Sequence, residues 1–127
     1  MFQNYSCNYI LEHGKFLGYL EPRFDRCKSF YKKARVYQID NQLFLISYNT
    51  NVMNILIEDG KSIKAQFFGY YSATTSRHLH EFYKQCELPS SDFPTAKQLK
   101  NIEKDLQVSY VTSIASLDRI LNNMWLK

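Results

Sequence analysis

Residues 35–68, RVYQIDNQLFLISYNTNVMNILIEDGKSIKAQFF, decide the fold of this chain. From Ala34 to Ile39 apolar and polar side chains alternate, which is the pattern of a strand with one buried face. Asp40-Asn41 then offers a turn, because both side chains can hydrogen-bond to nearby backbone, and the apolar run 43–46 follows it. This first part of the stretch predicts two antiparallel strands.

The second half of the same stretch extends the pattern. Val52 to Ile57 is another apolar run, and Asp59-Gly60 after it is the strongest turn signal in the chain, because this dipeptide suits the type I′ turn that matches strand twist. Ile63 to Phe68 would return from that turn. We therefore expect residues 35–68 to form an antiparallel meander.

A further hairpin is expected near the N-terminus. Tyr9-Ile10-Leu11 and the segment Phe16 to Leu20 are short apolar runs on either side of Glu12-His13-Gly14-Lys15. Gly14 can adopt the positive φ that a tight turn between strands requires. The first third of the chain is therefore predicted to form strands.

The spacing of apolar residues changes from two to about 3.6 after Tyr71, which marks a helix. The hydroxyl-rich residues 72–76, Ser-Ala-Thr-Thr-Ser, precede it and suit a helix N-cap. The apolar stripe occupies positions i, i+3, i+4 and i+7, namely Leu79, Phe82, Tyr83 and Cys86. We expect this first helix to pack on one face of the sheet.

Two more helices are expected towards the C-terminus. The segment Leu88 to Pro94 ends the first helix, and Thr95 with Gln98 forms a capping box at the start of a second. Between the second and third helices, Val108 to Thr112 is compatible with either strand or helix. The apolar stripes are Ala96, Leu99, Ile102 and Leu106 in the second helix, and Ile114, Leu117, Ile120, Leu121 and Met124 in the third.

These patterns predict an α+β fold: an antiparallel sheet of about four to five strands with one helix packed on it, followed by two C-terminal helices. The length of 127 residues fits one domain. We expect residues 1–127 to form a single α+β domain, with the sheet and the first helix in 1–88 and a helical part in 95–127.

Composition indicates a folded protein without membrane contact. The chain is 45% hydrophobic and 16% aromatic, unlike disordered chains. No apolar run is long enough to cross a bilayer, and residues 1–9 lack the basic start and apolar centre of a signal peptide. Cys7, Cys27 and Cys86 are odd in number and form no CxxC pair, so we expect reduced thiols rather than disulfides or a zinc site.

Basic residues are concentrated in one segment of a chain whose formal net charge is +4. Six of them lie between Arg23 and Arg35, against the single acid Asp25, and aromatic residues are interleaved with them. Single-stranded nucleic-acid binders use this mixture, although an acidic protein surface would suit it equally. The alternative is a solvated loop leading into a strand whose rings face the core. The residues predicted to bind a partner or nucleic acid are Arg23, Arg26, Lys28, Tyr31, Lys32, Lys33 and Arg35.

The start of the first helix is a second candidate site. Arg77 and His78 fall in its first turn, where the helix macrodipole disfavours cations by roughly 0.3 to 1 kcal/mol. A bound anion would reverse this penalty, because free backbone N–H groups and hydroxyls often bind anions at helix starts. The alternative is a Ser/Thr cap with Arg77 turned into water. The possible anion site comprises Thr74, Thr75, Ser76, Arg77 and His78.

No pattern in the chain predicts catalysis, a metal site or a cofactor. His78 and His80 are two positions apart on the predicted helix and point to nearly opposite sides, so they cannot easily share a metal ion. Cys27 has basic neighbours, but no sequence feature brings a histidine to it. The chain has no phosphate loop, GxGxxG, HExxH or GxSxG motif. We expect a protein that is not an enzyme and needs no cofactor.

Three segments taken together resemble a known family. They are CKSFY at 27–31 with Lys33-Ala34, SYNT at 47–50 with Val52, and YSATTSRHL at 71–79 with Phe82. Over roughly Cys27 to Gln85 the chain resembles a domain of unknown function that is common in small proteins of phages and other mobile elements of Gram-positive bacteria. Lys32 stands where that pattern has a glycine, and Asn49 where an acid is more usual.

The resemblance implies a setting rather than a chemistry. Short accessory proteins of such elements often act on host or competing machinery, and inhibitors of CRISPR nucleases are one class. We therefore expect, in the cytoplasm of the bacterial host, an anti-CRISPR-like inhibitor that binds a host defence protein or its nucleoprotein complex. The alternative is a small DNA- or RNA-binding regulatory protein. An enzyme that acts on a phosphorylated ligand at the start of the first helix is a distant third.

Overall fold

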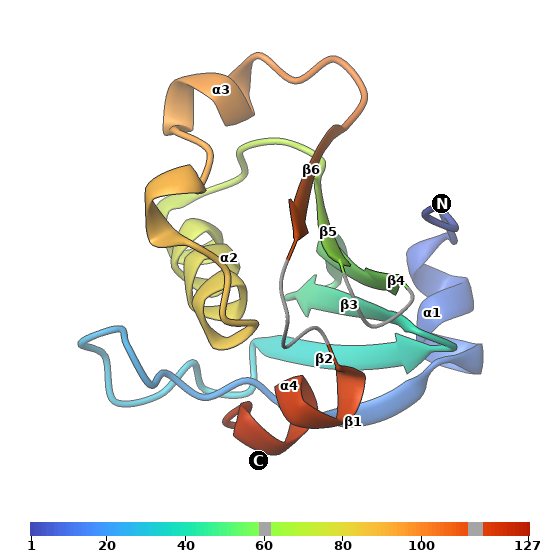
Figure 1. The fold of residues 1–127 in the computed structure, drawn as a ribbon. Coiled ribbons are helices and arrows are strands. Elements are labelled where there is room, and N and C mark those ends of the chain that lie inside the picture. Colours follow the sequence, from blue (N-terminus) through green and yellow to red (C-terminus); the bar gives the residue numbers. More distant parts are fainter. Residues whose placement is uncertain (59–61, 112–115) are drawn as a thin grey trace.

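The computed structural model describes residues 1–58, 62–111 and 116–127 and has the predicted α+β fold. Its centre is a six-stranded antiparallel sheet in which the strands follow one another in chain order (Figure 1). The strands are β1 (Lys15–Tyr19), β2 (Ala34–Ile39), β3 (Gln42–Ser47), β4 (Thr50–Glu58), β5 (Ser62–Phe67) and β6 (Leu106–Val111). The helices are α1 (Cys7–His13), α2 (Ala73–Gln85), α3 (Ala96–Lys100) and α4 (Leu117–Asn123), with a 3₁₀ turn at Ser90–Asp92.

The meander predicted from residues 35–68 is confirmed. Strands β2 to β5 pair as antiparallel neighbours, with Val36 opposite Leu45 and Ile55 opposite Ala65. Asp40-Asn41 forms the β2–β3 turn, and Asp40 has a φ of 53°, which aspartate tolerates better than most residues. The predicted Asp59-Gly60 turn lies outside the described residues.

Two helices cover opposite faces of this sheet (Figure 1). On one face the apolar stripe of α2 packs against Leu45, Ile55 and Phe67 in the main core. On the other face Ile10 of α1 packs against Tyr37, Phe44 and Ile46. Because alternate residues of β3 belong to the two clusters, this strand is buried on both faces.

The hairpin predicted at residues 9–20 is wrong in its first arm. Residues 9–11 lie in α1, while the second arm forms β1 as expected. Ser6 accepts a hydrogen bond from the Tyr9 backbone N–H and caps the helix. Tyr5, Tyr9 and His13 then stack at i, i+4 spacing, with ring centroids 4.7 and 4.4 Å apart. The i, i+4 spacing of these rings is typical of a helix, whereas the three-residue apolar run Tyr9-Ile10-Leu11 was interpreted as a strand.

The sheet also has more strands than the four to five predicted. The segment 95–127, expected to be helical, contains β6, which pairs with β5 along its whole length. The capping box of Thr95 and Gln98 is confirmed, but α3 ends at Lys100, so Leu106 lies in a strand rather than on a helical stripe. Exposure alternates from Leu106 to Tyr110, because strand side chains point to the two faces in turn.

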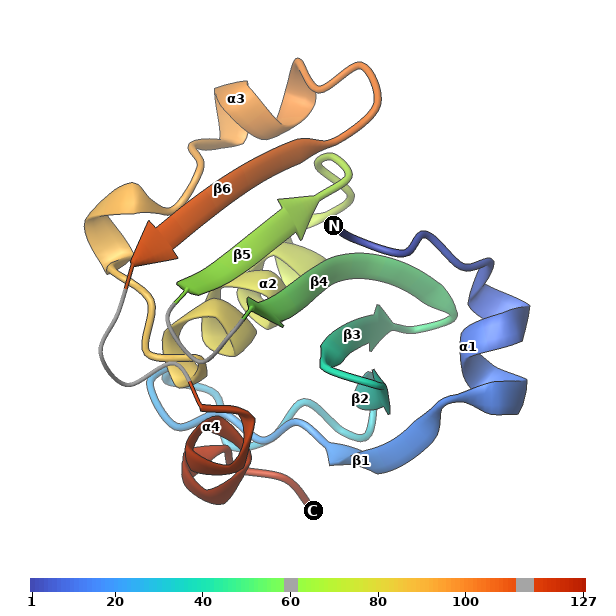
Figure 2. The same ribbon diagram turned by 45° about the vertical axis from the view of Figure 1, so that its right-hand side comes forward.

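The C-terminal residues close the other edge of the sheet (Figure 2). The third predicted helix is present as α4, with Ile120 buried, although Ile114 lies outside the described residues. After it the chain turns back along β1, where the Tyr19 and Lys127 backbones exchange hydrogen bonds of 3.0 and 2.9 Å. Gly18 permits this approach, because a Cβ there would lie 2.9 Å from Leu126 Cβ.

No helix among the described residues has both the length and the apolar character that crossing a membrane requires.

Candidate functional site

The fold brings the two predicted sites together. Residues 21–33 cross α2 as an extended loop, which we call the basic loop, and it encloses a cavity of about 390 Å³ with the start of that helix. Tyr31 and Lys33 of the basic loop line this cavity together with Arg77 and His78 of the possible anion site. The complete lining is Cys27, Ser29, Phe30, Tyr31, Lys33, Tyr48, Thr74, Arg77 and His78. We call this space the loop cavity.

A buried polar cluster lies beside the loop cavity, and His78 is the member of it that lines the cavity. His78 is buried, its Nδ1 lies 2.8 Å from the Ser47 hydroxyl, and that hydroxyl lies 3.0 Å from the Thr75 hydroxyl. The Phe30 ring packs edge-on against His78, with centroids 4.6 Å apart. Burial lowers the pKa of His78 to about 4, so the ring is neutral at pH 7. The neutral, hydrogen-bonded His78 is therefore a structural group rather than an acid or base.

The rim of the loop cavity carries exposed rings and cations. The Tyr31 side chain is 73% exposed and that of Tyr48 is 47% exposed. Lys33 Nζ lies 6.0 Å from the Tyr48 ring centroid, and Arg77, at the start of α2, is also exposed. The cavity therefore combines aromatic and cationic groups, and its lining contains no carboxylate.

Two segments that form this rim have an unusual backbone. Tyr31, Lys32 and Tyr48 have φ values of 52°, 63° and 57°, in the left-handed region that bulky residues rarely occupy. Such residues cost of order 1 to 3 kcal/mol each and cluster at functional sites. Here the conformation is held by hydrogen bonds from Tyr31 N–H to the Ser29 hydroxyl at 2.9 Å and from Tyr48 N–H to the Lys33 carbonyl at 2.7 Å.

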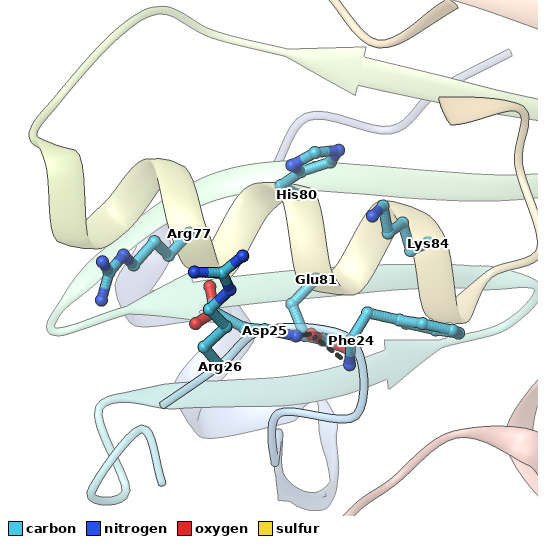
Figure 3. Close-up of a pocket in the computed structure, with 7 residues that line it drawn as sticks. All are labelled: Phe24, Asp25, Arg26, Arg77, His80, Glu81 and Lys84. Carbon is cyan, nitrogen blue, oxygen red and sulfur yellow. Dashed lines mark hydrogen bonds between the residues drawn. The ribbon is translucent and has the colours of Figure 1, made fainter. Parts of the chain in front are cut away.

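A second cavity of about 260 Å³ lies along the same helix (Figure 3). Phe24, Asp25 and Arg26 of the basic loop and Arg77, His80, Glu81 and Lys84 of α2 line it. Arg77 therefore borders both cavities. A hydrogen bond from the Cys27 backbone, and secondarily the nearby Arg77, lower the pKa of Asp25, so this residue is ionised at pH 7.

Of the two carboxylates that line this second cavity, Glu81 has a structural role. Glu81 is buried and accepts the backbone N–H groups of Phe24 and Asp25 at 3.0 and 2.8 Å, which Figure 3 shows as dashed lines. It also accepts the Gln85 amide at 2.6 Å. Gln85 in turn donates to the Glu21 carbonyl and accepts from the Trp125 backbone. This Glu81–Gln85 network joins the basic loop and the C-terminal segment to α2.

The other predicted binding residues differ in their surroundings. Lys28 and Arg26 are exposed, and Lys32 Nζ lies 5.6 Å from the Tyr19 ring centroid. Arg23 lies between two exposed rings, with its guanidinium carbon 5.2 Å from the Phe24 centroid and 5.7 Å from the Trp125 centroid. Arg35 instead donates to the Tyr48 carbonyl at 2.7 Å and to Asn49 at 3.2 Å, so it supports the β3–β4 turn.

The possible anion site is only partly accessible. Thr74 and Arg77 are exposed and line the loop cavity, whereas His78 lines it but is buried. The buried Thr75, whose hydroxyl lies 3.0 Å from that of Ser47, does not line it. Ser76 instead lines a third cavity of about 390 Å³ together with the half-buried Phe93. Of the five predicted residues, Thr74 and Arg77 are therefore the two that are both exposed and part of the lining.

Sequence reasoning missed several residues of this surface. Phe24 is one of the aromatic residues interleaved with the cations but was not among the predicted binding residues. Tyr48, Lys84 and Trp125 belong to segments distant in sequence from the basic loop. A signal for Tyr48 existed, since Ser47-Tyr48-Asn49-Thr50 is a two-residue turn between strands and places its tyrosine outward. For Lys84 and Trp125 only the tertiary fold supplies the proximity.

The cations of the basic loop form no ion pair with any residue that the structure describes. The ion pairs of the described residues lie elsewhere: the N-terminus and Lys64 with Glu58, His13 with Glu12, and Arg119 with Glu87. Within the same described ranges, no cluster of three or more histidine, cysteine or acidic residues could hold a metal ion. The three cysteines are unpaired. Burial and Asp25 raise the pKa of Cys27, which disfavours a nucleophilic thiolate, although Cys27 and His78 line the same cavity.

Comparison with known proteins identifies a family but no function. The model of a family described as "Family of unknown function (DUF8033)" matches residues 19–98, more than half of the chain, and the chain belongs to this family. The match includes every residue of both predicted sites and leaves out α1, β6 and α4. No curated protein and no solved structure matches the chain.

Proposed function

We propose that this member of a family of unknown function is a non-enzymatic accessory protein that binds and modulates a host defence protein or nucleoprotein complex in the bacterial cytoplasm. The phage or mobile-element setting comes from the resemblance of residues 27–85. The observation that carries the binding role is the group of exposed cations on the basic loop, which have no ionic partner among the described residues.

Charge of this kind suits a polyanionic partner. Lys28, Lys32 and Lys33 are exposed on one short segment, and Arg77 of α2 adds a fourth cation beside it. Clustered charge of one sign raises the rate at which an oppositely charged partner associates, and this attraction weakens as salt screens it. An effector complex that carries RNA, or one with an acidic nucleic-acid-mimicking surface, would meet this description.

Direct binding of single-stranded DNA or RNA is a second candidate function. Its specific support is that aromatic rings lie beside the cations: Phe24 and Trp125 with Arg23, and Tyr48 with Lys33. Proteins that bind single strands stack bases on such rings while cations follow the phosphates. A protein surface would use the charges but has less need of the rings.

The first prediction tests the basic loop by charge reversal. Replacing Lys28, Lys32 and Lys33 together with Glu should abolish most binding to the partner, yet change the melting temperature little, because exposed charges contribute little to folding. The matched control reverses Lys15, Lys97 and Lys104, three exposed lysines outside the loop, and alters the net charge equally. Unchanged binding in the loop variant would contradict the proposal.

The partner would be identified by affinity capture from a bacterial lysate before and after nuclease treatment. A partner that survives nuclease supports modulation of a protein, and one that is lost with the nucleic acid supports direct binding. Titration with bare single-stranded DNA and RNA separates the two further. A direct binder shows an affinity that falls steeply as salt rises, whereas a modulator shows little affinity for free strands.

A further inference from the structure

We propose that the loop cavity is a binding site for one unpaired nucleotide, with the base stacked on Tyr31 and the phosphate held between Lys33 and Arg77. This inference rests on the proposed function in so far as it assumes a partner that contains nucleic acid. It goes further by assigning one cavity and one ligand class. The volume of the loop cavity, about 390 Å³, lies within the range of small-ligand sites.

The two cations of the cavity lining are suited to a phosphate. Lys33 and Arg77 come from different elements, both are exposed, and neither belongs to an ion pair of the described residues. The exposed Thr74 beside them adds a hydroxyl that can donate to a phosphate oxygen. The lining contains no carboxylate, and Asp25, which lies near Arg77 in the second cavity, forms no ion pair with it among the described residues.

The aromatic residues of the cavity lining are suited to a flat ring. Tyr31 is 73% exposed, while Phe30 and the neutral His78, packed edge-on against each other, are buried members of the same lining. Nucleobases stack favourably on aromatic side chains whatever their sequence, because every base has a π-face. An inorganic phosphate would use only the cations, and an acidic peptide would leave the exposed ring without a partner.

The backbone around the cavity is already fixed in an unfavourable conformation. Tyr31 and Lys32 both have positive φ, and the Lys33 N–H donates to the Phe30 carbonyl at 2.9 Å to close this turn. Tyr48 on the facing turn also has positive φ and is joined to Lys33 through its backbone. Strain kept in two adjoining segments costs stability, and a preorganised ligand site is a physical reason to retain it.

The experiment is a titration of the full chain with UMP, AMP, uridine and inorganic phosphate, in which NMR chemical shifts report binding. We expect both nucleotides to bind more tightly than uridine or phosphate and to shift the signals of Tyr31, Thr74 and Arg77. Tyr31→Ala should weaken nucleotide binding about tenfold or more, whereas Tyr31→Phe keeps the ring and the affinity. Arg77→Gln should reduce the affinity for UMP but barely change that for uridine.

Controls separate this inference from the proposed function. Phe16 is an exposed ring on β1 outside the cavity, and Phe16→Ala should leave nucleotide affinity unchanged. Lys28 and Lys32 do not line the cavity, so their reversal tests the basic loop without altering the nucleotide site. If UMP binds no better than inorganic phosphate, or if Tyr31→Ala has no effect, the nucleotide site is refuted even when the basic loop still binds its partner. If an acidic peptide shifts the NMR signals of the cavity residues and UMP does not, the cavity belongs to a protein partner, and the nucleotide site is again refuted.

Discussion

Helix α2 presents two polar regions to the basic loop, and they differ in whether their charges have partners. In the Glu81–Gln85 network the buried carboxylate accepts two backbone N–H groups and an amide. One turn earlier, around Thr74 and Arg77, the cation is exposed and has no ionic partner among the described residues. Proximity to a cavity therefore does not by itself mark a functional charge. A satisfied charge holds the fold together, and an unsatisfied one is available to a ligand.

The largest effect on stability is expected at the satisfied region. Glu81→Ala should lower the free energy of unfolding by about 3 to 5 kcal/mol, because it leaves buried donors of the basic loop and of Gln85 without an acceptor. Chemical denaturation measures this loss. Glu103→Ala, at an exposed position, is the control and should have almost no effect. Equal stability of the two variants would mean that Glu81 is not a structural group.

The next effect concerns His78 in the lining of the loop cavity and depends on pH. His78 has a pKa of about 4 in the folded chain, below its ordinary value of about 6.5. Between these values the unfolded chain binds a proton that the folded chain does not, so stability falls as the pH decreases from about 6.5 to 4. The loss should reach about 3 kcal/mol at pH 4.

Thermal unfolding across this pH range tests the assignment to His78. The variant His78→Asn should flatten the pH dependence, whereas His80→Asn, at a half-buried position, should retain most of it. The lowered pKa values of Asp25 and Asp105 lie below 3.8, so those residues lose their contribution only under more acidic conditions. A wild-type chain with constant stability between pH 7 and 4 would contradict the buried, neutral His78.

The smallest of these effects separates two arginines of the same segment. Arg35→Ala should cost about 1 to 2 kcal/mol, because Arg35 donates to the Tyr48 carbonyl and to Asn49, while Arg26→Ala should leave stability nearly unchanged. Partner binding should show the reverse sensitivity at Arg26. Comparison of melting temperatures and affinities for both variants checks the distinction. A larger loss of stability from Arg26→Ala would remove Arg26 from the proposed binding surface.

Local patterns predicted the parts of the fold that depend on local physics. Alternation and the Asp40-Asn41 turn predicted the meander, and the Thr95 and Gln98 pair predicted the start of α3. The predictions that were wrong concern short segments, in which the local sequence signals are weak. Residues 9–11 are too few to distinguish a strand from a helix by periodicity, and 106–111 became a strand because the edge of β5 was open to it.

The candidate site divides in the same way. The sequence alone showed two chemically unusual segments, 23–35 and 74–78, because charge and residue type can be read without coordinates. Only the tertiary structure decided that they border one cavity, that Arg35 supports a turn and that Glu81 is satisfied. The physical reason is that composition is a property of each residue, whereas burial and hydrogen-bond partners depend on which distant segments the core brings into contact.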